Sequence, residues 1–323
     1  MIFEAGHPLF GCSNKKRSSE AKHIALINEA LMKKVLFLLF TLLPSLLMCD
    51  LADRLKPALN KDPYSRMYGI DYIYMINQDN RPDLYVNARA ALVAYGIKPY
   101  RFSAVSEQDI SPGLLRDISL KYQPWMTNFQ VSQCQDTDPL FARIDKMESI
   151  GEPYTCLRMT KGTAANWLSH LSVLQDAMLS GHQTIWVLED AIQVLQDPNI
   201  LISLMNELGL IVPDWDILFT DSGIQYLHPI NLETDPDYRR PDMSLLSSNS
   251  YRYMRRPISI HFSWEGPRHG AQSYIIKRSG IEKILNYFKE NGLFLPYDAE
   301  FTYLPLKAIR LNDPVVTFFY PAM

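Results

Sequence analysis

The sequence predicts an α/β fold in which strands and helices alternate around a main sheet. Three segments indicate it: a strand–helix–strand pattern over 71–105, a helix followed at once by a hydrophobic strand over 160–188, and a strand–helix pair over 273–288. With 323 residues, of which 47% are hydrophobic and 21% charged, the chain can bury one large core or two smaller ones. Its net charge of -3 provides no positive field of the kind that binds nucleic acid.

The first unit is predicted from an apolar run and the two elements after it. Residues 71–77 (DYIYMIN) are typical of a strand, because aromatic and β-branched residues dominate the run. A helix over about 84–95 would end at Gly96, and a strand over about 100–105 would follow. We therefore expect a β-α-β unit with two parallel strands.

The next well-marked element is an amphipathic helix over about 160–180. Its apolar face repeats every three or four positions through Trp167, Leu171, Leu174 and Met178. Gly181 can terminate this helix.

A short strand is predicted directly after that helix, over 184–188. Its continuous Ile, Trp and Val content is typical of a strand buried on both faces. Glu189 and Asp190 then stand at its carboxyl end, where open α/β sheets bind ligands. Carboxylates there suit a hard divalent cation such as magnesium or manganese. A solvated acidic turn is the alternative interpretation.

The carboxyl-terminal half contains four more predicted elements. A helix starts near Asp197, and short strands are expected over 215–219 and 273–276. Ser279 and Glu282 have the spacing of a capping box at the start of a further helix. That helix has an apolar face formed by Ile281, Ile284, Leu285 and Phe288. Residues 224–268 show no clear period, and we expect them to form a functional flap or an acceptor-binding insertion rather than a linker.

The amino-terminal fifty residues are predicted to address the chain rather than to join the fold. The apolar run 35–48 follows two lysines and is shorter than a membrane span of about 20 residues, so 32–50 is interpreted as a signal peptide or anchor. A buried helix and lipid attachment at Cys49 are the alternatives. We interpret 1–31 as an over-extended start and 51–70 as a linker, and expect the protein to be exported or tethered to a membrane.

Cys134 and Cys156 allow two interpretations. In an oxidising compartment they could close a loop of roughly 20 residues, contributing on the order of 3 kcal/mol. Two unpaired thiols are equally consistent with the sequence, and no spacing indicates structural zinc.

Seven short blocks in this order resemble glycosyltransferase family 25, which includes bacterial lipooligosaccharide galactosyltransferases and collagen hydroxylysine galactosyltransferases. The blocks are INQDNRPD (76–83), RFSAV (101–105), TKG and LSH (160–170), VLED (187–190), WDILF (215–219), GAQSYIIKRSG (270–280) and PYDAEF (296–301). The resemblance covers about 71–316. It implies one domain over 71–323 with a fold of the glycosyltransferase A type, a Rossmann-like nucleotide-binding mixed sheet flanked by helices.

The first block implies residues that hold the donor nucleotide. Asn77, Asp79, Arg81 and Asp83 match the family pattern INLDRRPDR, whereas Gln78, Asn80 and Leu84 depart from it. The departures imply weaker phosphate contacts or a different donor. An ordinary polar turn between strand and helix is the alternative.

The third and fourth blocks imply further donor-binding residues. Lys161 could meet a diphosphate, and Gly162 permits close backbone approach at a helix N-terminus. His170 and Glu189 complete this set. The alternatives are that Lys161 is a solvated cap residue and that His170, beside the apolar face, is a hydrogen-bonded core histidine.

The acidic motif departs most from the family. Where the family has EDD, this chain has Glu189, Asp190 and Ala191, and the last acid is usually a metal ligand in enzymes of this fold. Asp190 is therefore the expected ligand of manganese or magnesium, with His261, His269 or water assisting. Loss of metal dependence is the alternative.

The last block implies the catalytic groups. Asp298 matches the Asp of the family's PVDEF block. The resemblance implies transfer with inversion at the sugar carbon, and such a single displacement requires a base that deprotonates the acceptor hydroxyl. Asp298 is the first candidate for that base or for acceptor binding, and Glu300 is the second, with a local turn cap as the alternative. Three aromatic side chains of the insertion could stack on sugars or pack in the core: Tyr251, Tyr253 and Trp264.

The expected function is transfer of a hexose, with galactose from UDP-galactose favoured, to a hydroxyl of a glycan (lipopolysaccharide or lipooligosaccharide) or of a protein acceptor. The competing interpretation is a catalytically impaired family member that binds sugar or protein, including a secreted effector. The replacement of the third acid by Ala191 keeps both open.

Overall fold

The computed structural model describes residues 51–128, 130–134, 141–144, 146–223, 239–242, 256–266 and 268–318. The chain divides into two compact units, 1–50 and 51–323, and every element below belongs to the second. The predicted start (1–31), the signal or anchor (32–50), Tyr251 and Tyr253 lie outside the described residues. Within the described ranges, no helix has the length and apolar character needed to cross a bilayer.

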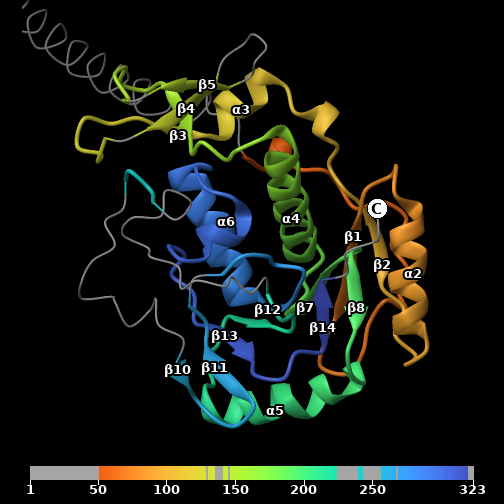
Figure 1. Cartoon of the computed structure of the whole chain (residues 1–323). Helices are drawn as coiled ribbons and strands as arrows, with labels where there is room; N and C mark the ends of the chain where they lie inside the picture. Colours follow the sequence, from red (N-terminus) through yellow and green to blue (C-terminus); the bar gives the residue numbers. More distant parts are fainter. Residues whose placement is uncertain are drawn as a thin grey trace, which may run out of the picture. The chain divides into compact units, whose positions relative to one another are not determined.

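In the described residues, eight strands form one mixed sheet in the order β10-β11-β13-β9-β12-β7-β1-β2 (Figure 1). The strands are β1 (Tyr72–Asn77), β2 (Tyr100–Ser103), β7 (Thr184–Glu189), β9 (Ile217–Phe219), β10 (Arg256–Pro257), β11 (Phe262–Trp264), β12 (Ser273–Lys277) and β13 (Ala308–Leu311). β1 pairs in parallel with β2 and β7, whereas β12 runs antiparallel to β7 and β9. The expected α/β class is confirmed.

Helices cover both faces of this sheet (Figure 1). α4 (Lys161–Leu179) and α6 (Arg278–Asn291) pack on one face, and α2 (Pro82–Val93) and α5 (Leu201–Ile211) contribute to the core on the other. Because successive strand side chains point to opposite faces, Tyr74 of β1 joins the α4 side and Met75 joins the α5 side. β1 and β7 are therefore buried on both faces, as the apolar run 184–188 predicts.

Smaller elements surround the main sheet. An antiparallel sheet in the order β3-β6-β4-β5 lies within residues 120–155. Its strands are β3 (Leu120–Lys121), β4 (Val131–Cys134), β5 (Phe141–Ile144) and β6 (Pro153–Thr155), and β8 (Ile192–Val194) pairs with β14 (Val316–Phe318). The remaining helices are η1 (Leu51–Arg54), η2 (Glu107–Asp109), α3 (Pro112–Ile118), η3 (Pro198–Ile200) and α7 (Tyr297–Glu300). Cys134 and Cys156 are both free and buried.

The predicted β-α-β unit and the helix–strand pair are confirmed. Thr160 caps α4 by accepting a hydrogen bond from the Thr163 amide at 3.1 Å, and Gly181 follows the helix with φ 75°. This positive φ is disfavoured for residues other than glycine, so Gly181 ends the helix at low cost.

The predicted capping box at the start of α6 is wrong. α6 begins at Arg278, directly after β12, without a side-chain cap. The Ser279 hydroxyl instead donates to Asp216 at 2.8 Å, and Glu282 accepts from Arg278 at 3.1 Å. A tertiary contact thus engages Ser279, and a contact within α6 engages Glu282, so neither side chain caps the helix.

The segment 51–70, expected to be a linker, packs on the domain instead. Lys56 Nζ donates to Ser103 Oγ at 2.8 Å, and Lys61 Nζ donates to Asp176 Oδ2 at 2.6 Å. These partners lie far away in the sequence, so local composition does not reveal the contacts.

Two helical glycines provide a test of this packing. A Cβ on Gly280 in α6 would lie 2.9 Å from the backbone oxygen of Asp216, whereas a Cβ on Gly209 in α5 would meet nothing within 4 Å. We expect Gly280→Ala to destabilise the fold by about 1–3 kcal/mol through overpacking. Gly209→Ala should stabilise it by about 0.5–1 kcal/mol. Urea unfolding measures both, and equal effects would contradict the close approach of α6 to the sheet.

Candidate functional site

Polar residues gather at the edge of the sheet where β1 and β7 end. In the parallel pair, Ile76 lies opposite Glu189. Asn77 therefore shares this edge with Glu189 and Asp190, which we call the acidic pair. β12 runs in the other direction and begins here, and the backbone amide of Glu189 donates to the backbone carbonyl of Gln272 at 2.8 Å. The edge therefore combines the ends of two parallel strands with the start of an antiparallel one.

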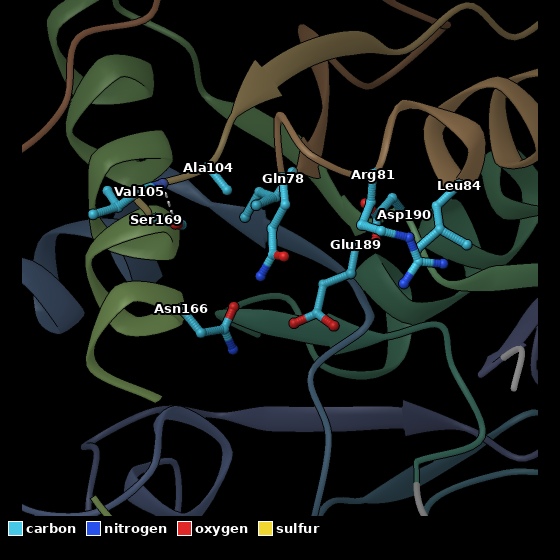
Figure 2. A pocket seen from close by; sticks show the side chains of 10 residues that line it. Gln78, Arg81, Leu84, Ala104, Val105, Asn166, Ser169, Glu189 and Asp190 are labelled. Carbon is cyan, nitrogen blue, oxygen red and sulfur yellow. Dashed lines mark hydrogen bonds between the residues drawn. The ribbon is translucent and has the colours of Figure 1, made fainter. Parts of the chain in front are cut away.

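A pocket of about 290 Å³ opens at this edge between β1, β7 and α4 (Figure 2). Figure 2 shows the polar ends of Gln78, which directly follows β1, Asn166 of α4 and Glu189 of β7 pointing toward one another. The lining residues are Ile76, Gln78, Arg81, Leu84, Ala104, Val105, Asn166, Ser169, Glu189 and Asp190. This volume lies near the lower end of the range for small-molecule sites, about 300–1,000 Å³, so the pocket accommodates one part of a larger ligand.

Glu189 is oriented from inside the protein by His170, which is fully buried. His170 Nε2 lies 3.1 Å from Glu189 Oε1, and Nδ1 lies 2.9 Å from the Tyr274 hydroxyl. A neutral imidazole satisfies both bonds when Nε2–H donates to the carboxylate and Nδ1 accepts from Tyr274. The imidazole also stacks on the Tyr297 ring, with centroids 4.2 Å apart. His170, predicted to bind the donor, thus contacts Glu189 and the core rather than lining the pocket.

Asp190 is held by Asn77, another predicted donor-binding residue. The Asn77 amide donates to Asp190 Oδ2 at 2.6 Å and to the Arg81 carbonyl at 2.8 Å, while its own oxygen accepts from Arg101 at 2.6 Å. Burial raises the pKa of Asp190, and the charge of Glu189 adds to this effect, against the opposing hydrogen bond from Asn77. Asn77 is therefore a buried connector that fixes Asp190 at the pocket wall.

The other residues of the first block lie nearer the surface. Asp79 accepts hydrogen bonds from Ser103 at 2.8 Å and Arg101 at 2.7 Å, and these bonds lower its pKa. Arg81 lines the pocket and lies 3.3 Å from the exposed Asp83. Of this block, Arg81 is thus the predicted residue that presents a charged group to the pocket.

The amino-terminal turn of α4 does not line the pocket. Lys161 is exposed as the first residue of the helix, and a Cβ on Gly162 would make an ordinary contact, 3.6 Å from Glu107. Asn166, further along the same helix, lines the pocket instead. Sequence reasoning missed Asn166 because it falls in the part of the block that departs from the family pattern.

Asp298 lies beside the start of β12. Its carboxylate accepts from the Gly270 amide at 2.5 Å and the Ala299 amide at 3.0 Å, and His269 Nδ1 lies 3.7 Å away. Burial would raise the pKa of Asp298, but the interaction with His269 and the hydrogen bond from the Gly270 amide outweigh it and lower the pKa. A lowered pKa makes this carboxylate a weaker proton acceptor.

The family model of glycosyltransferase family 25, described as an LPS biosynthesis protein, matches residues 101–300. The chain belongs to glycosyltransferase family 25. Membership supports a transferase of LPS biosynthesis, with a sugar donor and a glycan acceptor in general. The match includes α4, the acidic pair and Asp298, whereas the block 76–83 precedes it. Comparison with curated proteins gave no match.

The acidic motif of this family 25 chain lacks the third acid, and this bears on whether the site can hold a metal ion. Among the described residues, no three or more His, Cys, Asp or Glu side chains form a group that could hold a metal. His261 lies 3.9 Å from Glu207 and His269 lies near Asp298, so both expected assistants have other partners. Magnesium often takes one or two carboxylates together with substrate phosphates. A cation at the acidic pair would therefore need further ligands from a phosphate-bearing molecule.

Glu300, the second candidate for the family 25 base, is not supported. It is fully buried and forms a 2.5 Å ion pair with Arg240, while the Leu295 amide and the Tyr287 hydroxyl also donate to it. With its oxygens held inside the core, Glu300 cannot meet an acceptor. Trp264 packs against the core on the α5 side, in line with its alternative interpretation.

The Glu300–Arg240 pair predicts a large stability effect. Glu300→Gln leaves buried Arg240 with Asp242 as its remaining acidic partner, and we expect a loss of about 3 kcal/mol, the lower end for breaking a buried pair. Glu282→Gln, which breaks an exposed pair with Arg278, is the matched control and should cost at most about 0.5 kcal/mol. Urea unfolding distinguishes them, and similar losses would contradict the structural role of Glu300.

Asp298 predicts a pH-dependent contribution to stability. Its pKa is lower in the folded than in the unfolded protein, so its stabilising effect is present above about pH 4 and is lost as the pH falls through the folded value. Asp298→Asn should cost about 1.5–3 kcal/mol at pH 7, because hydrogen bonds to a charged group are lost.

The free energy of unfolding of Asp298→Asn and of the original protein is measured from pH 7 to pH 3. The difference between the two free energies should become smaller as the pH falls. Asp214→Asn removes an exposed carboxylate paired with Lys307 and should change little. A difference for Asp298→Asn that does not vary with pH would contradict the assignment.

Proposed function

We propose that this family 25 member transfers a hexose, with galactose from UDP-galactose favoured, to a hydroxyl of a glycan or protein acceptor with inversion. The pocket at the ends of β1 and β7 carries the proposal. There Glu189 and Asp190 lie within the family match and share the pocket with Arg81 and two side-chain amides.

In this proposal each side chain of the pocket has a distinct task. Arg81 supplies positive charge for the donor diphosphate. Glu189, oriented by His170, accepts hydrogen bonds from donor hydroxyls, and Gln78 and Asn166 exchange further ones. A magnesium or manganese ion held by Asp190 and the diphosphate would neutralise charge on the leaving nucleotide.

For the acceptor, the proposal uses Asp298 and its neighbour His269. Because its pKa is lowered, Asp298 is better suited to binding the acceptor or orienting His269 than to direct proton abstraction. Imidazole is the side chain whose ordinary pKa lies closest to neutrality, which suits a proton acceptor. The 3.7 Å separation between the two side chains supports this division of roles.

A catalytically impaired binding protein is the second candidate. The observation in its favour is the acidic motif, in which Ala191 follows the two carboxylates and the described residues offer no larger metal-binding group. Such a protein would keep the pocket and bind sugar nucleotide without turnover.

Nucleotide binding and hydrolysis together distinguish the two candidates. We expect the purified protein to hydrolyse UDP-galactose or UDP-glucose slowly with manganese, and Asp190→Ala to lower kcat about 100-fold or more. Isothermal titration calorimetry should show weaker UDP binding by the same variant. Glu290→Ala, on the exposed surface of α6, is the control that should behave as the original protein.

Binding that depends on Asp190 without hydrolysis would favour the binding protein. If neither hydrolysis nor Asp190-dependent binding is observed, both candidates fail.

A further inference from the structure

Another pocket opens at the opposite edge of the main sheet, where β1 and β7 begin. It has a volume of about 950 Å³ and lies between residues 61–72 and 181–183. Tyr72 lines it, whereas Ile76 on the same strand lines the candidate donor pocket, and four residues of strand separate the two by about 13 Å. The two pockets are therefore distinct sites.

The walls of this pocket are held together by hydrogen bonds between distant segments. Asp71 Oδ2 accepts from the Gln183 amide at 2.6 Å and from the Thr184 amide at 3.0 Å. Gly69 and Gly181, with φ of 76° and 75°, form the turns on either side. The pocket is thus preformed, as binding sites for small molecules usually are.

The charges of the lining do not suit an anion. Lys61 Nζ already donates to Asp176 at 2.6 Å, Ser180 at 2.7 Å and the Tyr74 hydroxyl at 3.2 Å, so its three N–H groups are used. Burial, together with the charge of Lys61, lowers the pKa of His182 and keeps its imidazole neutral at pH 7. The carboxylate of Asp71 balances the exposed Arg66 in the same lining.

The lining instead offers mixed hydrogen-bonding groups beside an aromatic ring. His182 Nε2 is buried and has no hydrogen-bond partner among the described residues, and its ring stacks on Tyr72 at 5.2 Å. Tyr68 is 77% exposed on the rim, and the exposed Asp71 and Gln183 add an acceptor and an amide. A ligand that matches this lining needs hydroxyl groups that both donate and accept, and a flat face of C–H groups for the tyrosine.

We propose that this pocket binds a neutral oligosaccharide, independently of the donor site. A sugar ring placed against Tyr68 would present its hydroxyls to the exposed side chains of Gln183 and Asp71. The volume, near the upper end for small-molecule sites, has room for more than one ring. The proposal does not rest on sugar transfer and holds equally for a protein without turnover.

Saturation-transfer difference NMR tests the site with lactose, maltotriose and N,N′-diacetylchitobiose as probes on the full chain. We expect at least one of them to bind, and Tyr68→Ala to weaken that binding about tenfold or more, because the aromatic face on which the sugar ring would pack is lost. Gln183→Ala should weaken it several-fold. Tyr64→Ala, which removes an equally exposed tyrosine outside the lining, and Asp190→Ala should leave it unchanged.

Both Tyr68 and Gln183 are exposed, so their substitution is not expected to unfold the protein. The proposal is overturned if none of the three sugars receives saturation, or if binding persists unchanged in Tyr68→Ala and Gln183→Ala. Loss of sugar binding in Asp190→Ala alone would place the sugar in the donor pocket and would also overturn it.

Discussion

The hydrogen-bonded chain from Glu189 through His170 and Tyr274 to Tyr297 is the interaction on which the candidate site depends. It connects β7, α4, β12 and α7, four elements from distant parts of the sequence. Burial raises the pKa of Tyr274 far above its ordinary value, so this hydroxyl remains a neutral donor. Because unsatisfied polar groups are costly in such an interior, Glu189 is fixed in one orientation by the packing of the whole sheet.

Much of the fold could be predicted from the sequence, because hydrophobic periodicity reports local geometry. The face of α4 and the doubly buried β7 follow from patterns within about 20 residues. The wrong predictions, of a linker over 51–70 and of a capping box in α6, have a different origin. Lys61 looked like part of a linker because its partner Asp176 lies on α4, and the capping box failed because Ser279 bonds to Asp216 near the start of β9.

The candidate site was predictable in part for the same reason. The acidic pair follows from the position of β7, but Asn166 gave no signal because it lies where the chain departs from its family. Asp298 and Glu300 show the limit most clearly. They stand two residues apart in one short helix, yet Glu300 is buried against the remote Arg240 while Asp298 faces the start of β12.

The reversed direction of β12 separates two roles that a parallel strand would combine. Its incoming loop, 268–272, arrives at the edge that carries the candidate site, while α6 leaves from the opposite edge. In a parallel strand, the loop at the ligand edge would also lead into the packed helix. Here, the loop beside the candidate site and the junction of β12 with α6 lie at opposite ends of the strand. This architecture allows recognition to diverge between relatives while the helix–sheet core remains unchanged.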